Sequence, residues 1–376
     1  MKGLSELQTA IRDTVRAFAQ ETIRPHSARF EAEGGYPPAL FEEMAGLGLW
    51  GMTAPEAFGG AEADAVSYAL ALMEIAAADG ALSTIVSIQN SILVSGLLKD
   101  GSEGQKARFL PDLIGGRTIG AFALTEADAG SDASAVRTRA VKVEGGWRIT
   151  GAKQFITSGR IAGLVMIIAV TDPDAGKKGL SAFIVPTDRP GYAVDKVEHK
   201  MGQGASDTCA LRFDDMFVED DLLIGAPGQG YRIALANLET GRIGIAAQCV
   251  GMAQAALEIA VAYAKDRKSF GKPIIEHQAV GFRLADLAAR LEAARQLVLH
   301  AARVKDQGLP CLTEASMAKL FASETAEAVV SGALQTLGGY GYLEEYGVAK
   351  IYRDVRVCQI YEGTSDIQRM VIARSL

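Results

Sequence analysis

The sequence predicts a mainly helical protein with a central β domain, and three observations support this architecture. Apolar residues recur at helical spacing from Leu4 to about Arg117. The period changes near Ile119, where short alternating segments between glycine, proline and aspartate turns are typical of strands. Helical spacing returns after Tyr231 and continues to the end. We therefore expect an N-terminal helical domain (1–117), a middle β domain (118–229) and a C-terminal helical bundle (230–376).

A chain of 376 residues is too long for one ordinary core, which agrees with two or three packed units. Hydrophobic residues make up 49% and charged residues 22%, as in globular proteins with a large core. A net charge of −7 argues against a surface for nucleic acid or anionic membrane. The apolar segment 243–264 is interrupted by Gln248, Gln254 and Glu258, so it predicts a buried helix rather than a membrane span. The chain starts without a charged-then-apolar leader, and we expect a cytoplasmic protein without membrane insertion.

Individual elements follow from local patterns. The segments 66–78 and 82–98 are apolar nearly all round, which predicts helices packed between other helices. The polar residues 89–91 inside the second segment either line a pocket or make hydrogen bonds in the core, and the core is the commoner outcome. Residues 139–150 predict a hairpin around a Gly-Gly turn. Further strands are expected at 165–169, 180–185 and 209–213, and bundle helices at 233–265, 277–307 and 314–337.

The segment before the last helix contains the main catalytic candidate. Ser365 and Gln368 have the S-x-x-Q spacing of a capping box, so a helix is expected to begin there. Glu362 then lies in a turn just outside the helix, with apolar Ile360 and Tyr361 ahead of it. A carboxylate held against an apolar wall has a raised pKa and suits a general base. The alternative is an exposed surface Glu, which these residues alone favour because perturbed carboxylates are a minority.

Four further segments combine small, hydroxyl-bearing, aromatic or basic residues that suit a flat or phosphate-bearing ligand. They are Phe122–Asp132, Gly151–Gly159, Arg267–Gln278 and Gln335–Tyr342. The first offers N–H and hydroxyl groups in a loop, and the third offers a planar guanidinium for phosphate. Taken singly, each is more often an ordinary turn, a core strand, a solvated basic loop or a helix C-cap.

Several motifs are absent from the sequence. It contains no G-x-G-x-x-G turn, no G-x-x-x-x-G-K-[ST] phosphate loop and no G-x-S-x-G elbow. The four histidines lack the spacing of metal ligands, so no metal is expected. The four cysteines lie far apart, which favours free thiols: Cys209, Cys249, Cys311 and Cys358.

Residues Tyr361–Arg369 read Y-E-G-T-S-D-I-Q-R and resemble the C-terminal signature of the acyl-CoA dehydrogenase family. The other four segments resemble the family's T-E-P-x-A-G-S-D, G-x-K-x-W-I-T-N-G, R-x-x-F-G-x-P and Q-x-x-G-G-x-G motifs, in the family's order. Ala127 and Asp128 replace the usual Pro-Gly, and Phe155 replaces the common Trp. The resemblance covers essentially the whole chain and implies the family's fold, with a middle β-barrel and a C-terminal four-helix bundle.

The same resemblance implies FAD as the cofactor and a set of residues that contact it. These are Phe122, Leu124, Thr125, Gly130, Ser131, Phe155, Ile156, Thr157, Arg267, Ser269, Phe270, Gln278, Gln335, Gly338, Gly339, Thr364 and Asp366. In the family, the segment that matches Arg267–Gln278 reaches the FAD of a neighbouring subunit. The resemblance thus implies a homo-oligomer, by family habit a tetramer, and an electron-transferring flavoprotein as the usual electron acceptor.

The reaction implied is the conversion of an acyl-CoA to the trans-2-enoyl-CoA, with Glu362 removing the α-proton, as in fatty acid β-oxidation or branched-chain amino acid catabolism. The substrate contacts implied are Ser131, Glu239, Arg242, Gln248, Tyr361, Gly363 and Arg374. Some family members carry the base at the position of Gly241, which has no side chain to act as one. Gln248 resembles the residue at the bottom of the acyl pocket in short-chain and short-branched-chain members, and we hypothesise that it shortens this pocket.

Three alternatives remain. A same-fold dehydrogenase could act on acyl groups bound to a carrier protein, and the sequence does not exclude this. A related flavin oxidase would not need the base that Glu362 supplies. A DNA-associated relative would need a basic face, against which the net charge of −7 argues.

Overall fold

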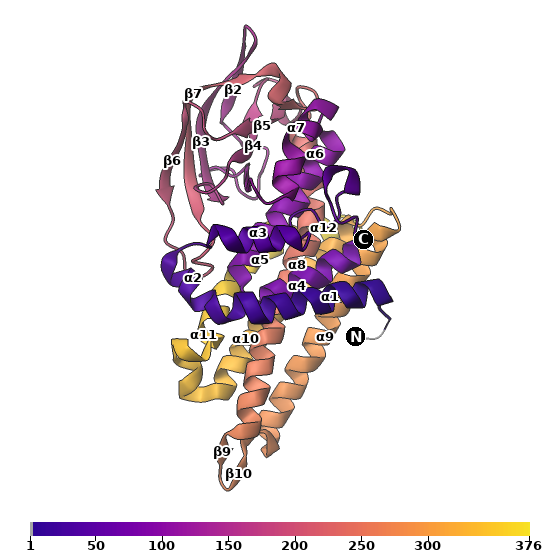
Figure 1. Ribbon diagram of the computed structural model, residues 1–376, viewed down its shortest axis with the longest axis vertical. Helices are drawn as coiled ribbons and strands as arrows, with labels where there is room; N and C mark the ends of the chain where they lie inside the picture. Colours follow the sequence, from indigo (N-terminus) through magenta and orange to yellow (C-terminus); the bar gives the residue numbers. More distant parts are fainter. Residues whose placement is uncertain (1–2) are drawn as a thin grey trace.

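The computed structural model describes residues 3–376 as three units, with the β unit at one end and a long helical bundle at the other (Figure 1). The N-terminal unit consists of α1 (Glu6–Phe18), α2 (Ser27–Glu33), α3 (Pro38–Gly46), α4 (Ala65–Ala78), α5 (Gly80–Ile88), α6 (Ser95–Asp100) and α7 (Glu103–Ile114). A π-helical turn, Gln89–Val94, joins α5 to α6 into one continuous rod. The first helix begins at a capping box formed by Ser5 and Gln8.

The polar residues inside that rod satisfy backbone groups of the core. The Gln89 side chain donates to the Leu113 carbonyl at 2.8 Å and accepts from the Gly120 N–H at 2.9 Å. Asn90 accepts from the Met52 N–H at 2.8 Å and also donates to two carbonyls. The expectation of core hydrogen bonds is therefore confirmed, and these contacts fix the rod against the chain that leads into the β unit.

The middle unit is one mixed sheet of eight strands. They are β1 (Gly120–Ala123), β2 (Arg139–Val143), β3 (Gly146–Thr157), β4 (Leu164–Val170), β5 (Leu180–Pro186), β6 (Tyr192–Val197), β7 (Thr208–Glu219) and β8 (Leu223–Ile224). The hydrogen-bonded order is β6-β7-β3-β2-β4-β5-β8, with β1 also pairing to β4 in parallel. The predicted hairpin is β2 and β3, which pair through Val143 and Gly146 at the turn. Strands β4 and β5 are buried along nearly their whole length and form the centre of this unit.

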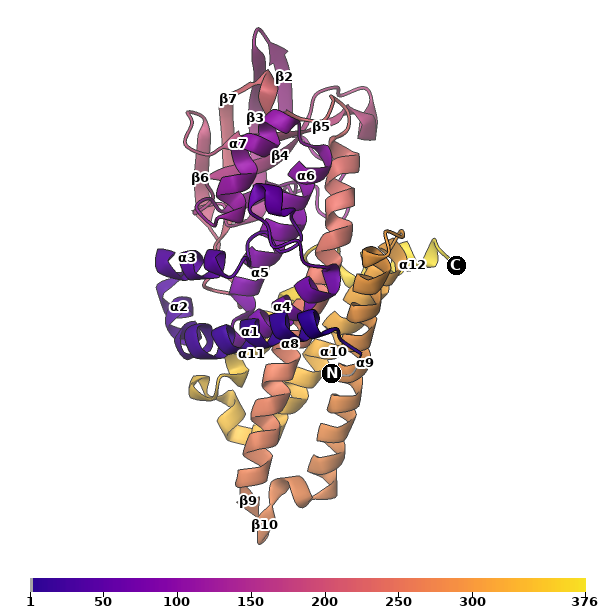
Figure 2. The same cartoon turned by 45° about the vertical axis from the view of Figure 1, so that its right-hand side comes forward.

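The C-terminal unit is built on three long helices, α8 (Gly230–Asp266), α9 (Gln278–Asp306) and α10 (Leu312–Leu337). The shorter α11 (Val348–Val355) and α12 (Ser365–Ala373) follow. A small hairpin of β9 (Lys268–Ser269) and β10 (Lys272–Pro273) forms the tip between α8 and α9 (Figure 2). Among the described residues, the stretches Gly80–Asp100 and Gly230–Asp266 are long and apolar enough to cross a membrane, but 89% and 72% of their most apolar windows are buried inside the protein, as in core helices.

The N-terminal helices and the C-terminal bundle share one hydrophobic core. It joins Trp50 and Leu70 from the first unit to Ile245 and Val330 from the last. The second core lies inside the β unit and extends to the π-helical turn, α6, α7 and the start of α8. Helix α8 thus contacts both cores, which places its first half at the junction of all three units.

One local prediction is wrong, and strand β6 was not predicted. The last helix is capped by Thr364, whose hydroxyl accepts from the Ile367 N–H at 3.3 Å, so the predicted capping box of Ser365 and Gln368 is wrong. Gln368 instead turns back and donates to the Gly363 carbonyl at 2.9 Å. Strand β6 has no clear alternation in the sequence, because its side chains are only partly buried at the edge of the sheet.

Candidate active site

One cavity of about 190 Å³ lies where the β unit, the α5–α6 rod, the first half of α8 and the turn before α12 meet. Twelve residues proposed from the sequence line it: Phe122, Leu124, Thr125, Gly130, Ser131, Phe155, Ile156, Thr157, Arg242, Tyr361, Glu362 and Gly363. Seven more that the sequence did not single out complete the wall: Thr84, Ile88, Ile92, Ala133, Leu235, Leu238 and Ile367. Because most of these added residues are apolar, the cavity offers a dry surface beside its polar groups.

Glu362 has an unusual backbone and a buried carboxylate. Its φ of +53° is rare for a residue with a side chain, and such strain persists where the surroundings fix it. The Oε2 atom is buried and has no hydrogen-bond partner among the described residues. Burial raises the pKa of Glu362 to about 7, and the positive charges of Lys319 and Arg242 act in the opposite direction. The carboxyl group can therefore accept a proton near neutral pH.

Gly241 makes room for this carboxylate. A Cβ added at Gly241 would lie 2.0 Å from Glu362 Oε2 and 2.9 Å from its Cδ, so no larger residue fits without moving the acid. The glycine lies in α8, about three helical turns after its first residue, Gly230, and directly against the base candidate. The absence of a side chain at position 241 is thus a steric requirement for the observed position of Glu362.

The turn that carries Glu362 is held by two side chains that sequence reasoning missed. The Lys319 ammonium is fully buried and donates to the Gly363 carbonyl at 2.7 Å. Gln368 donates to the carbonyls of Gly363 and Glu362 at 2.9 and 3.2 Å. A sequence signal for Lys319 exists, because it is the only lysine in the otherwise alanine-rich core face of α10. These bonds fix the carboxylate from behind without contacting its oxygens.

A buried ion pair shapes the loop after β1. Lys153 on β3 has a side chain with 0% exposure and donates to the Leu124 carbonyl at 2.9 Å and to Glu126 at 2.8 Å. The Glu126 carboxylate also accepts from the N–H groups of Arg137 and Thr138 at 2.7 and 3.0 Å. Burial lowers the pKa of Lys153 to about 8, and the Glu126 charge partly offsets that effect. The pair positions Thr125 and the small residues that follow it along the cavity wall.

Phe155 lies at the mouth of the cavity. Its ring is 63% exposed, and its φ of +59° coincides with an irregularity in the pairing of β3 with β7. This bulge turns the ring toward the cavity rather than into the core, which the sequence alone did not favour. Thr157 follows two residues later on the same wall.

Seven other proposed cofactor residues lie far from this cavity, at the opposite end of the bundle. Arg267, Ser269, Phe270 and Gln278 belong to the tip between α8 and α9 (Figure 2), while Gln335, Gly338 and Gly339 lie at the end of α10. The tip and the end of α10 lie near each other. Tyr263, near the end of α8, packs against Tyr340, just after α10, with 6.1 Å between ring centroids. Phe270 is 95% exposed. One chain therefore does not bring these residues to the cavity that Glu362 lines.

The remaining proposed residues surround the site without lining the cavity. Glu239 accepts a hydrogen bond from the Cys311 thiol at 3.2 Å. Thr364 caps the start of α12, and Asp366 and Arg374 are exposed in the first turn and at the end of that helix. Gln248 is fully buried behind the wall, where its amide donates to Thr84 Oγ1 at 2.6 Å. The expected direct contact of Gln248 with the pocket is thus replaced by a contact through Thr84.

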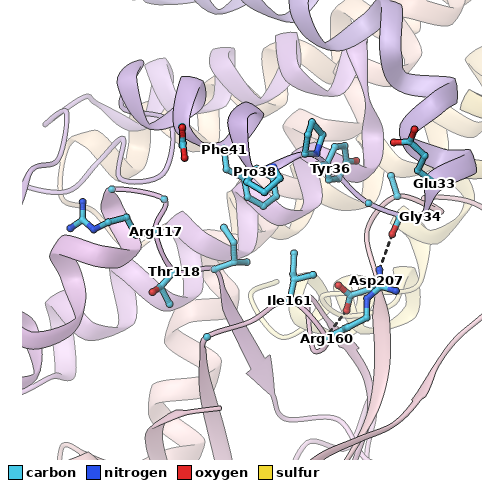
Figure 3. A pocket seen from close by; sticks show the side chains of 18 residues that line it. Glu33, Gly34, Tyr36, Pro38, Phe41, Arg117, Thr118, Arg160, Ile161 and Asp207 are labelled. Atoms are coloured by element: carbon cyan, nitrogen blue, oxygen red, sulfur yellow. Dashed lines mark hydrogen bonds between the residues drawn. The ribbon is translucent and has the colours of Figure 1, made fainter. Parts of the chain in front are cut away.

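A larger cleft of about 870 Å³ opens between the α2–α3 connection and the β unit (Figure 3). Tyr36, Pro38 and Phe41 form one side, and Ile161 and Arg160 form the other, with Arg160 donating to the Gly34 carbonyl at 2.8 Å. None of the motif residues that line the smaller cavity belongs to it. Size alone therefore does not locate the chemistry, and the smaller cavity is the candidate active site.

Comparison with known proteins bears on this site. The chain matches the family models described as acyl-CoA dehydrogenase N-terminal domain over residues 5–117, middle domain over 121–216 and C-terminal domain over 228–376. It is 46% identical to an acyl-CoA dehydrogenase of Bacillus subtilis over 99% of this chain and 98% of the relative.

The chain belongs to the acyl-CoA dehydrogenase family. A short-chain specific, mitochondrial acyl-CoA dehydrogenase of Bos taurus is 43% identical over 99% of this chain and 90% of its own. Among solved structures, butyryl-CoA dehydrogenase from Megasphaera elsdenii has a TM-score of 0.97 at 39% identity, covering 100% of this chain and 99% of that one. The prolyl acyl carrier protein oxidase AnaB has a TM-score of 0.95 at 32% identity, covering 99% of both chains. The fold is thus common to proteins with different substrates. Membership of this family makes the protein a flavin-dependent oxidoreductase with FAD as its cofactor.

The cavity of this acyl-CoA dehydrogenase family member has groups that suit a flavin. Phe122 and Phe155 offer aromatic surface, and the hydroxyls of Thr125, Ser131 and Thr157 offer hydrogen bonds for a polar ring edge and a phosphate. An added Cβ at Gly130 would meet nothing within 4 Å, so the loop is open on the side that faces a ligand. These residues fit the flavin half of FAD.

Proposed function

We propose that this protein oxidises a short-chain acyl-CoA, straight or branched, to the trans-2-enoyl-CoA, with Glu362 as the base that removes the α-proton. The observation that carries this proposal is the buried, unpartnered Oε2 of Glu362 on the wall of the cavity that also contains the flavin motifs. Support for a short acyl group comes from the short-chain specific relative and from Thr84 and Tyr361, which line the cavity and are hydrogen-bonded to the buried Gln248 behind them.

The residues of the chain suggest how the proton is removed. The α-hydrogen of a thioester is a weak acid, so its removal needs a dry site and a stabilised enolate. Ile88, Ile92 and Leu238 give the cavity that Glu362 lines an apolar wall, which favours a dry site. The Glu362 N–H makes no hydrogen bond with the described residues, which leaves it available for the thioester oxygen. When bound, FAD supplies the acceptor for the hydride that leaves the β-carbon.

The anaerobic visible spectrum during titration with butyryl-CoA tests this function. We expect the oxidised flavin absorbance to bleach in the wild type and to persist in Glu362→Gln with FAD still bound. Bleaching by a carrier-protein thioester but not by any acyl-CoA would instead support the carrier-dependent alternative, for which the likeness to a carrier protein oxidase is the specific observation. A protein that cannot be reconstituted with FAD would contradict both functions.

The rate of flavin reduction should depend on pH through Glu362. Its raised pKa of about 7 means that the carboxyl is protonated and inactive below this pH and becomes a base above it. We expect kcat/KM to rise about tenfold per pH unit below 7 and to level off above it. Stopped-flow reduction between pH 5.5 and 8.5 measures the inflection. Glu324→Gln, at a surface ion pair with Arg369, should leave it in place, whereas an inflection near pH 4.5 would contradict the assignment.

We also propose that the FAD site is completed by a second copy of the chain. The exposed Phe270 and Arg267 lie at the tip of the bundle, far from the cavity of their own chain, and the family resemblance assigns them to a neighbour's FAD. An electron-transferring flavoprotein is the proposed electron acceptor.

Mixing two inactive variants tests the shared site. Arg267→Ala should retain less FAD while its own Glu362 remains intact, and Glu362→Gln should have an intact tip but no base. If the tip acts between subunits, mixed oligomers should regain activity. In such an oligomer the normal tip of a Glu362→Gln subunit can complete the site of an Arg267→Ala subunit, whose Glu362 is intact. If the tip acts within its own chain, mixing restores nothing.

A further inference from the structure

Four polar side chains close the inner end of the acyl cavity as a ring of hydrogen bonds. They come from all three units: Thr84 on α5, Gln203 in the β6–β7 connection, Gln248 on α8 and Tyr361 before α12. Thr84 Oγ1 donates to Gln203 Oε1 at 2.8 Å and accepts from Gln248 Nε2 at 2.6 Å. The Tyr361 hydroxyl donates to Gln248 Oε1, and Gln203 Nε2 donates to the Tyr361 oxygen at 3.4 Å. Thr84 and Tyr361 line the cavity, whereas the two glutamines stand behind them.

Gln203 is held more firmly than its place in a loop predicts. It is 4% exposed and has a φ of +54°, a conformation that costs free energy for any residue except glycine. Its N–H donates to Asp354 Oδ1, and its side-chain amide donates to the Asp354 carbonyl at 3.2 Å. The neighbouring Gly202 has no room for a Cβ, which would lie 2.4 Å from the Arg353 backbone. The β6–β7 connection thus packs directly against α11.

Asp354 is in turn part of a buried charged cluster. Its carboxylate is 2.6 Å from Lys350 Nζ, which lies 3.6 Å from Asp79 Oδ2. Asp79 accepts from the Tyr36 hydroxyl at 2.8 Å and from the Leu82 N–H at the start of α5. The cluster therefore connects the N-terminal helices, the β6–β7 connection and α11, and it fixes the place from which the Gln203 side chain extends.

We propose that Gln203 is a specificity-determining positioning residue, which holds Thr84 and Tyr361 in place and so sets the depth of the acyl cavity. This inference rests on the proposed function, because that function defines the cavity as the acyl site. Without the Gln203 amide, Tyr361 loses one of its hydrogen-bond partners, and the space behind it becomes free. The phenol ring of Tyr361 can then move away from the cavity, which lengthens the cavity. Because Tyr361 directly precedes Glu362, this movement also changes the surroundings of the base. Gln248 alone does not close the ring.

The test removes the side chain and keeps the loop. Gln203→Gly keeps the backbone N–H that donates to Asp354 Oδ1, and glycine suits a positive φ. The β6–β7 connection should therefore keep its contact with α11. We measure kcat/KM for butyryl-, hexanoyl- and octanoyl-CoA. The ratio of butyryl- to octanoyl-CoA should fall about tenfold, because Thr84 and Tyr361 each lose a hydrogen bond that holds them at the end of the cavity. Asp215→Gly, at another left-handed residue with φ +46° on the surface of β7, is the matched control and should leave the ratio unchanged.

A second measurement separates positioning from a general structural role. If Gln203 acts through Tyr361, Gln203→Gly should add little to the shift in chain-length preference caused by Tyr361→Phe. Equal losses for all three substrates, with effects that add in the double variant and a lowered Tm, would overturn the proposal. Should the glycine variant fail to fold, Gln203→Asn tolerates a positive φ and shortens the amide, and it should give a smaller shift in the same direction.

The proposed function and this inference fail in different ways. If the wild type is reduced by none of the three acyl-CoA substrates, the proposed function is contradicted. If the wild type is reduced and Gln203→Gly keeps the wild-type ratio, only the role of Gln203 is contradicted.

Discussion

Glu362→Gln should lower kcat for the reduction of the bound flavin by acyl-CoA about 10³- to 10⁴-fold, the upper range for loss of a general base. The amide has the size of the acid but cannot accept the α-proton. Because Oε2 has no hydrogen-bond partner within residues 3–376 and burial disfavours its ionised form, the fold does not depend on the charge of Glu362. Single-turnover reduction of the holoenzyme under anaerobic conditions measures the loss.

The variant must keep its FAD for this result to count. The flavin spectrum and the FAD to protein ratio should match the wild type, since the groups that fit the flavin lie on the β unit. The Tm should stay the same or rise slightly at pH 8. Burial of an ionised Glu362 costs stability above its pKa of about 7, and that cost is absent near pH 4.5 and below, where the acid is protonated in both states. A fall of less than tenfold in kcat would exclude Glu362 as the base.

Gly241→Ala should reduce kcat/KM about 10²-fold although it adds only one methyl group. The new Cβ would lie 2.0 Å from Glu362 Oε2, so the carboxylate must move by about 1 Å or more, and a shift of this size costs about two orders of magnitude. Alanine is also the better helix former by about 1 kcal/mol, so α8 should not be destabilised. The expected combination is an unchanged or higher Tm with much lower activity.

Gly104→Ala on α7 is the matched control for this substitution. An added Cβ there meets only Ser102 Oγ at 3.9 Å, far from the cavity. It should give the stability gain of an alanine in a helix and leave kcat/KM unchanged. If Gly241→Ala behaves like this control, the close packing of α8 against the base has no part in catalysis.

The order of the units and most elements could be predicted from the sequence, because hydrophobic period and turn residues are local signals. The long helices α8, α9 and α10 begin and end within a few residues of the predicted positions. The site was harder to predict. Glu362 was found through its motif, but its left-handed backbone and its contact with Gly241 depend on packing between residues 121 positions apart.

Lys319 stands out in the sequence of α10 but its role could not be predicted from it, and Gln203 does not stand out at all. A lysine in a helix is usually a solvated surface residue, and the hydrogen bond of Lys319 to the Gly363 carbonyl becomes apparent only in the folded chain. Gln203 lies in a connection without a recognisable pattern, and its partners Thr84 and Tyr361 come from distant parts of the chain. Partners of this kind become visible only when the three units are assembled.

The core shared by the first and last units has a consequence for biosynthesis. Trp50 and Leu70 are packed against residues such as Ile245 and Val330, which leave the ribosome many seconds later at about 5–20 residues per second. During this interval the N-terminal helices expose apolar surface that no later part of the nascent chain yet covers. We therefore expect residues 1–117 not to fold as an independent unit, and translation of this protein to need chaperone protection until α8 and α10 emerge.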